Sequence, residues 1–162
     1  MSELLRNISQ IYRAQLQRHR NRPFLRAVMA GCALVAMASG AVSFRQRVRV
    51  DRVMETLDAL KVFDPHEGVE LFNEFAETLK TDPETGHQLV LDVVSREVSQ
   101  DPEKARLLAR ICLAVSEQEG EVSPAERREI AALCGSVGLD PGDCSLGLDE
   151  IPLAAEADHE GD

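Results

Sequence analysis

The chain has 162 residues, of which 44% are apolar and 28% are charged. This composition is typical of one folded domain rather than of a disordered chain. The formal net charge is −10, Trp is absent, Tyr occurs once and Phe five times. Overall acidity and scarce aromatic rings exclude a protein whose whole surface binds nucleic acid, and we expect no nucleic-acid partner.

The charge is divided unevenly along the chain. Residues 1–52 contain ten arginines and only two acidic residues, for a balance of +8, whereas residues 53–162 have a balance of −18. The last stretch, 149–162, holds six acidic residues and no basic ones. It is predicted to be a disordered acidic tail.

The first predicted helix, residues 3–20, lies within a basic N-terminal segment, 1–21, and is amphipathic. One face is apolar, and arginines lie on or just beyond the other, which suits an anionic membrane surface or an acidic partner. Packing of the apolar face on the rest of the chain, or use of the segment as an Arg-rich mitochondrial leader, are the alternatives. The arginines proposed for the partner or membrane surface are Arg6, Arg13, Arg18, Arg20 and Arg22.

An uncharged segment, residues 27–43, follows this basic helix. About 17 residues rich in Ala, Gly and Ser are at the lower limit of what can cross a bilayer. We therefore predict that the segment contributes a buried core helix rather than a membrane span.

Signals for the start of a helix recur along the rest of the chain. A residue with a capping oxygen precedes Pro at Asp64, Asp82, Asp101, Ser123 and Asp140, which is the N-cap followed by Pro at the first helical position. Asp64 and Ser123 also have Glu three residues later, as in a capping box. Apolar residues then recur at helical spacing. The predicted helices are 3–20, 24–38, 44–61, 65–80, 84–99, 102–117, 124–136 and a short one from 141.

An internal repeat relates two parts of the chain. A shift of 80 residues pairs Cys32 with Cys112, Gly40 with Gly120 and Ser43 with Ser123. Each copy reads as a helix, a Gly turn and a Ser-capped helix. The sequence therefore predicts an all-α, compact bundle of about seven to eight helices, built from two pseudo-symmetric helical repeats.

The turn of the second repeat is the candidate metal site. Acidic side chains lie within ten residues there, and carboxylates are preferred ligands of hard divalent cations. A weakly bound divalent cation is one hypothesis; helix capping by Ser123 and Glu126, with a positive φ at the glycines, is the other. The candidate ligands are Glu119 and Glu126, with Glu117 and Glu121 as weaker candidates.

No set of residues predicts an enzyme. The chain has no nucleophile elbow, phosphate loop or dinucleotide fingerprint, and we assign no catalytic residue. Cys32 and Cys112 lie on apolar helices and are expected to be small core residues.

Several segments of the chain carry a family resemblance. They are Leu60-Lys61-Val62-Phe63-Asp64, Leu71-Phe72-Asn73, Asp101-Pro102-Glu103-Lys104-Ala105, Ile111-Cys112-Leu113-Ala114-Val115 through Gly120 and Glu126, and Gly138-Leu139-Asp140-Pro141. Together they resemble the TerB family of bacterial tellurite-resistance proteins. The resemblance covers about residues 22–144, and we place a TerB-like domain at 22–148. It implies a compact helical, cytoplasmic protein that works beside a membrane-embedded TerC-type partner and metal-related TerD-type proteins.

The chain departs from the family at the first turn. Members usually have Asp-Gly at both turns and an acidic residue in the helix that follows; here Ser39-Gly40 and Gln46 replace the first acidic cluster. We therefore expect a non-enzymatic interaction or scaffold component in tellurite resistance, cytoplasmic and peripheral to the inner membrane. The alternatives are a divalent-cation sensor that uses the second turn and a thiol-dependent protein that processes oxyanions through Cys32 or Cys112.

Overall fold

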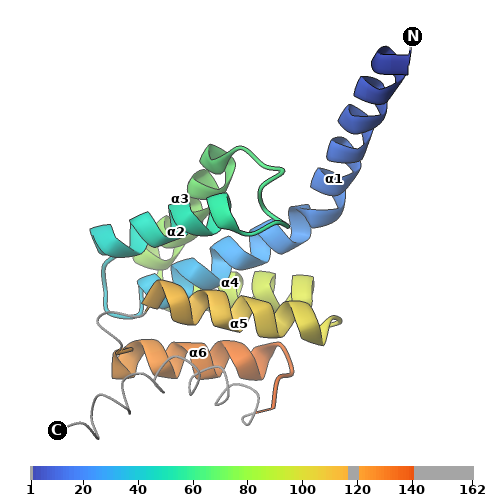
Figure 1. The fold of residues 1–162 in the computed structure, drawn as a ribbon. Helices are drawn as coiled ribbons and strands as arrows, with labels where there is room; N and C mark the ends of the chain where they lie inside the picture. The colour runs from blue at the N-terminus through green and yellow to red at the C-terminus, as the bar shows by residue number, and fades with distance from the viewer. Residues whose placement is uncertain (1, 117–120, 141–162) are drawn as a thin grey trace, which may run out of the picture.

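The computed structural model describes residues 2–116 and 121–140, which form six α-helices and no strand (Figure 1). The prediction of an all-α protein is confirmed. The helices are α1 (Ser2–Ala36), α2 (Phe44–Thr56), α3 (Pro65–Thr81), α4 (Pro83–Val98), α5 (Pro102–Ser116) and α6 (Pro124–Ser136).

The helices begin where the capping residues predict. The side chains of Asp64, Asp82 and Ser123 each accept a hydrogen bond from a backbone N–H in the first turn of α3, α4 and α6, which satisfies donors that have no partner inside the helix. The capping box predicted at Asp64 does not form, because the Asp64 side chain accepts from the N–H of His66 while the N–H of Glu67 donates to the Asp64 carbonyl oxygen.

Two predicted helices are one in the structure. The prediction broke the chain between residues 20 and 24, but α1 runs through this region with Pro23 inside it. Proline removes one N–H and leaves the carbonyl of residue 19 without its helical donor. His19 is exposed, so water can bond that carbonyl. The described residues therefore form six helices instead of seven to eight, and the short helix predicted from 141 lies outside them.

Helix α2 also differs from its prediction, ending at Thr56 rather than at 61. Leu57 takes an extended backbone conformation, and the chain then turns so that Leu60 and Phe63 enter the core. Burial of these two side chains outweighs the local preference for helix, which is a weak one.

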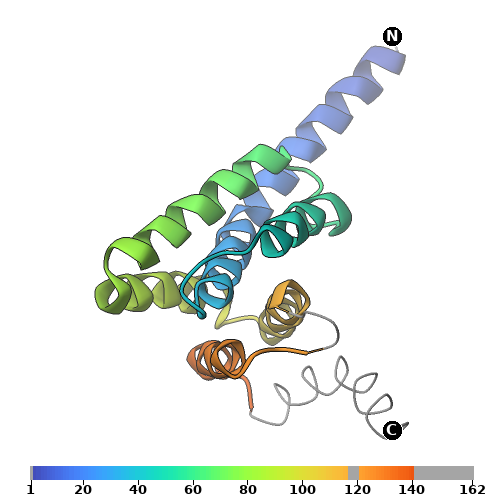
Figure 2. The ribbon, with the colours of Figure 1, turned by 90° about the vertical axis from the view of Figure 1, so that its left-hand side faces the viewer.

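The second half of α1 is the centre of the molecule. Its residues from Phe24 to Ala36 are buried, apart from the partly exposed Arg26, and α1 packs on α3, α4, α5 and α6. In Figures 1 and 2 these helices surround it while its first half projects away from them. The prediction of a buried core helix in this segment is confirmed, and none of the helices described here is long and apolar enough to span a bilayer.

Candidate functional site

The first half of α1 forms a projecting arm, which we define as residues 2–17 (Figure 1). Sixteen helical residues extend for about 24 Å. The large apolar side chains of the arm are about half exposed or more, because no described element covers them. They are Leu4, Leu5, Ile8, Ile11, Tyr12 and Leu16.

The five candidate arginines fall into two groups. Arg6, Arg13 and Arg20 are exposed, and the first two lie on the arm. Arg18 Nε donates to the carbonyl oxygen of Val62 at 2.7 Å. The guanidinium of Arg22 lies over the ring of Phe63, 5.5 Å from its centroid. Arg18 and Arg22 therefore also hold α1 against the segment between α2 and α3.

Asn21 strengthens the same attachment. Its Nδ2 donates to the carbonyl oxygen of Ala59 at 2.9 Å, one turn of helix beyond the arm. The arm thus begins where the side chains of α1 stop contacting residues 59–63. The sequence pattern predicts the amphipathic helix but not the residue at which it separates from the other helices.

The two repeated turns place their capping residues together. Ser43 caps α2 through a full capping box with Gln46. At α6, the N–H of Glu126 donates to Ser123 Oγ, but the Glu126 side chain accepts from the serine hydroxyl, Oγ to Oε1 2.6 Å, instead of reaching back to the Ser123 N–H. The second capping box is therefore only half formed. Gln46 Nε2 donates to Glu126 Oε2 at 3.0 Å.

Of the four predicted metal ligands, Glu126 takes part in this contact. Glu117 and Glu119 are outside the described residues, and Glu121 is exposed. Glu126 is only 7% exposed, and each of its oxygens already accepts a hydrogen bond. Among the residues that the structure describes, no three His, Cys, Asp or Glu side chains form a group that could hold a metal ion. The Gln46 atom that faces Glu126 is an amide nitrogen, which does not ligate a hard divalent cation.

Gly40 confirms the turn prediction in the first repeat. Its φ is +101°, a left-handed conformation that favours glycine, whereas the equivalent Gly120 lies outside the described residues.

Cys32 on α1 and Cys112 on α5 are both fully buried free thiols. A hydrogen bond with Cys32, burial, and the charges of Cys32 and Glu129 raise the pKa of the Cys112 thiol well above its usual range. Because the thiolate is the reactive form, Cys112 is held in its unreactive state. This confirms the expectation that both cysteines are core residues.

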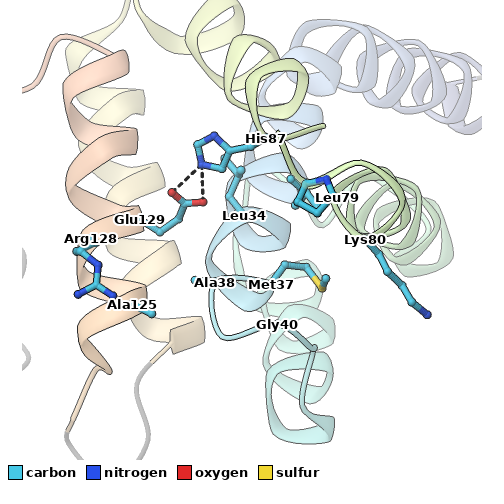
Figure 3. A pocket seen from close by; sticks show the side chains of 11 residues that line it. Leu34, Met37, Ala38, Gly40, Leu79, Lys80, His87, Ala125, Arg128 and Glu129 are labelled. Carbon is cyan, nitrogen blue, oxygen red and sulfur yellow. Dashed lines mark hydrogen bonds and ion pairs between the residues drawn. The ribbon is translucent and has the colours of Figure 1, made fainter. Parts of the chain in front are cut away.

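A cavity that sequence analysis missed lies between α6 and the junction of α3 with α4 (Figure 3). It has a volume of about 490 Å³. Apolar side chains, including Leu34 and Leu79, form much of its wall. Its wall also holds a polar contact in which His87 Nε2 lies 2.8 and 2.9 Å from the two carboxylate oxygens of Glu129.

The His87–Glu129 pair joins α4 to α6 across the cavity. Glu129 is largely buried and His87 is partly exposed. None of the described residues that line the cavity is Ser, Thr, Cys or Tyr; its other charged side chains are those of Lys80 and Arg128. His87 and Glu129 are 42 positions apart without a motif, and sequence gives no signal of their pairing.

Comparison with known proteins identifies the family. A family model described as tellurite resistance protein TerB matches residues 25–147. A tellurium resistance protein TerB from Alcaligenes sp is 30% identical over 97 residues, which are 60% of this chain and 79% of the relative. No solved structure matches the chain significantly. Since the matched region covers well over half of the sequence, the chain belongs to the TerB family of tellurite-resistance proteins.

Proposed function

We propose that this protein is a non-enzymatic interaction component of tellurite resistance, which docks through its arm at the cytoplasmic face of the membrane beside a membrane-embedded TerC-type partner. Family membership supports the link to tellurite. The observation that carries the docking proposal is the arm, whose apolar face no described element covers.

Size and shape support docking by the arm. Six large apolar side chains occupy four helical turns, and their burial in a partner or bilayer interface removes a wide apolar surface from water. An isolated helix of this length is marginal in water. The arm continues a helix that Arg18 and Asn21 attach to the segment between α2 and α3, so it extends from a folded domain.

The charges of the arm favour an anionic binding surface. Arg6 and Arg13 are the basic residues of the arm, and Glu3 is its acidic one. Two copies of the arm packed together would bring like charges close, whereas an anionic lipid surface or the acidic margin of a membrane protein attracts them. The same arginines can interact with lipid headgroups while the apolar face inserts below them.

The internal repeat is a further part of the proposal. Equivalent positions 80 residues apart meet twice, at Gln46 with Glu126 and at Cys32 with Cys112. These contacts support two related helical hairpins arranged about a common axis, from which the arm extends as an addition to the first hairpin.

Vesicle flotation tests the docking. The full chain should float with vesicles that contain phosphatidylglycerol and not with pure phosphatidylcholine. Leu5→Ser/Ile8→Ser should abolish flotation, and Arg6→Gln/Arg13→Gln should remove the preference for anionic lipid. Arg45→Gln/Arg52→Gln removes the same charge from the exposed face of α2 and serves as the control. Equal flotation of all four proteins would refute docking through the arm.

The partner needs a separate measurement. In membranes that contain a tagged TerC-type protein, cross-linking from Ser9→Cys in the middle of the arm should capture that protein, and cross-linking from Ser99→Cys, an exposed position at the end of α4, should not. Flotation without capture would leave lipid docking in place and reject the TerC-type partner.

A further inference from the structure

The starts of α2 and α6 meet through side chains that are equivalent in the two repeats. The described part of the chain buries three polar or charged side chains, those of Gln46, Ser116 and Glu126. Ser116 bonds within its own helix. The other two bond to each other, so their contact is a buried polar link between α2 and α6, which both also pack on α1 and α5.

The orientation of the Gln46 amide is determined by two bonds. Its Oε1 accepts from the backbone N–H of Ser43 at 2.9 Å. Its Nε2 must therefore face Glu126, where it donates at 3.0 Å. A flipped amide would place its oxygen against a carboxylate and its NH2 group against an N–H, and both contacts would be lost.

Among the described residues, the side chains that donate to the Glu126 carboxylate are both neutral. Oε1 accepts from the Ser123 hydroxyl and Oε2 from the Gln46 amide. A buried carboxylate is expensive unless hydrogen bonds or a counter-charge compensate it. Here two hydrogen bonds from uncharged groups provide the compensation that a cation could otherwise supply.

We infer that Gln46 makes the contact between the two helix starts independent of any cation. A carboxylate at position 46 could still accept the Ser43 N–H with one oxygen. Its other oxygen would then lie about 3 Å from that of Glu126, where two negative charges repel unless a proton or cation lies between them. One amide in place of one carboxylate therefore decides whether the link needs a metal ion.

This inference is independent of membrane docking, because Gln46 and Glu126 are far along the chain from the arm. It concerns this chain's own residues. It predicts that divalent cations do not stabilise the link, and that a single substitution creates such a dependence.

Thermal unfolding tests the inference with the full chain, in EDTA and in excess calcium or manganese, with NaCl added to match ionic strength. The unfolding midpoint of the wild type should be the same in all three. Gln46→Glu should lower the midpoint in EDTA by about 4–10 °C, as expected for the loss of a buried hydrogen bond together with repulsion. Calcium or manganese should restore most of that loss.

Two further variants distinguish loss of the contact between positions 46 and 126 from nonspecific destabilisation of the fold. Gln46→Glu/Glu126→Gln exchanges the partners: the amide at 126 can donate to the carboxylate at 46 while its oxygen accepts from Ser123. This double variant should recover the wild-type midpoint in EDTA and show no cation effect. Glu126→Gln alone should lose a few degrees at most, equally with and without cation.

Three results would overturn the inference. The first is cation stabilisation of the wild type that Glu126→Gln abolishes; stabilisation that survives in Glu126→Gln lies elsewhere and leaves the inference standing. The second is an equal midpoint for Gln46→Glu in EDTA and in cation. The third is an exchange variant no more stable in EDTA than Gln46→Glu, which also decides the matter if the single variant fails to fold.

Discussion

Helix α1 has two halves that use apolar residues in opposite ways. From Phe24 to Ala36 the helix is buried on nearly every side. In the arm, residues 2–17, the large apolar residues stay exposed. The buried half contains small residues at close intervals, such as Ala27, Ala30 and Gly31, which allow neighbouring helices to approach its backbone. The arm has Leu, Ile and Tyr on one wide face and arginines elsewhere.

The difference shows that apolar content alone does not indicate which part of a helix is core. Small side chains all round a helix permit packing on several sides, whereas a single apolar face needs one partner. Paired substitutions, one in each half, test whether the two halves differ in solution as they do in the structure.

Truncation of a large side chain should give the largest difference in stability between variants of the two halves of α1. Leu25→Ala, at a position with no exposed surface, should lower the free energy of unfolding by about 2–5 kcal/mol, because it leaves a cavity in the core. Leu5→Ala in the arm should change it by no more than about 0.5 kcal/mol. Urea unfolding measures both values. Equal losses would show that the arm is covered by another part of the chain.

Addition of volume should have the next largest effect. A Cβ at Gly31 would lie 3.0 Å from Cys112 Sγ and 3.3 Å from side-chain atoms of Leu108 and Leu133. Gly31→Val should therefore destabilise the protein by about 1–3 kcal/mol through overpacking. Ser9→Val, at an exposed position of the arm, is the control and should stay within about 0.5 kcal/mol. A tolerated valine at 31 would mean that α1 and α5 are not in close contact.

Alkaline pH should weaken the buried half through its thiol. The pKa of Cys112 is raised in the folded state, so above the usual thiol pKa of about 8.5 the unfolded chain releases a proton that the folded chain retains. The stabilising effect of the neutral thiol is complete below that pH and is lost as pH rises towards the folded pKa, by up to about 1.4 kcal/mol per pH unit. Cys112→Ala should show a shallower decline between pH 8 and pH 10, measured by urea unfolding at each pH. Parallel profiles would contradict the prediction.

The hydrogen bond of Asn21, which lies between the two halves of α1, should contribute less to the stability of the protein. Asn21→Ala removes a donor and leaves the Ala59 carbonyl without its side-chain partner, which should cost about 1 kcal/mol. Asn7→Ala, at an exposed site of the arm, is the matched control and should be nearly neutral. Hydrogen exchange of the segment 57–63 should increase in the first variant alone.

Deletion of the arm should have the smallest effect on stability. A chain that begins at residue 18 should lose helical signal in circular dichroism yet keep its free energy of unfolding within about 0.5 kcal/mol, because the large apolar side chains of the arm are exposed. A loss above about 1 kcal/mol would show that the arm packs on its own chain.

Much of this fold is predictable because its signals are local. An Asp or Ser before Pro starts a helix through the bonds of a single turn, and α3, α5 and α6 begin at the predicted residues. Continuity of α1 through Pro23 was not predictable from the proline alone. Just before this point, Arg18 and Asn21 contact residues about 40 positions away, which local rules do not predict.

The candidate sites also divide into those with local sequence signals and those formed by contacts between distant residues. Sequence periodicity identified the apolar face and arginines of the arm, since both lie within one helix. The His87–Glu129 pair and the Gln46–Glu126 bond join distant helices. The repeat aligned Gln46 with Glu126 and capping rules gave each a local role, but only the packing of α1 and α5 between their helices brings the two side chains together.

The central position of α1 has a consequence for synthesis. Helix α1 is synthesised before α3, α4, α5 and α6, which cover its buried half. Until about residue 136 has emerged, the apolar stretch 24–36 has no complete set of partners. Long-range contacts of this kind delay folding and leave apolar surface open to aggregation. The buried half of α1 is thus synthesised before the helices that enclose it, and its apolar surface stays open until the last of them has formed.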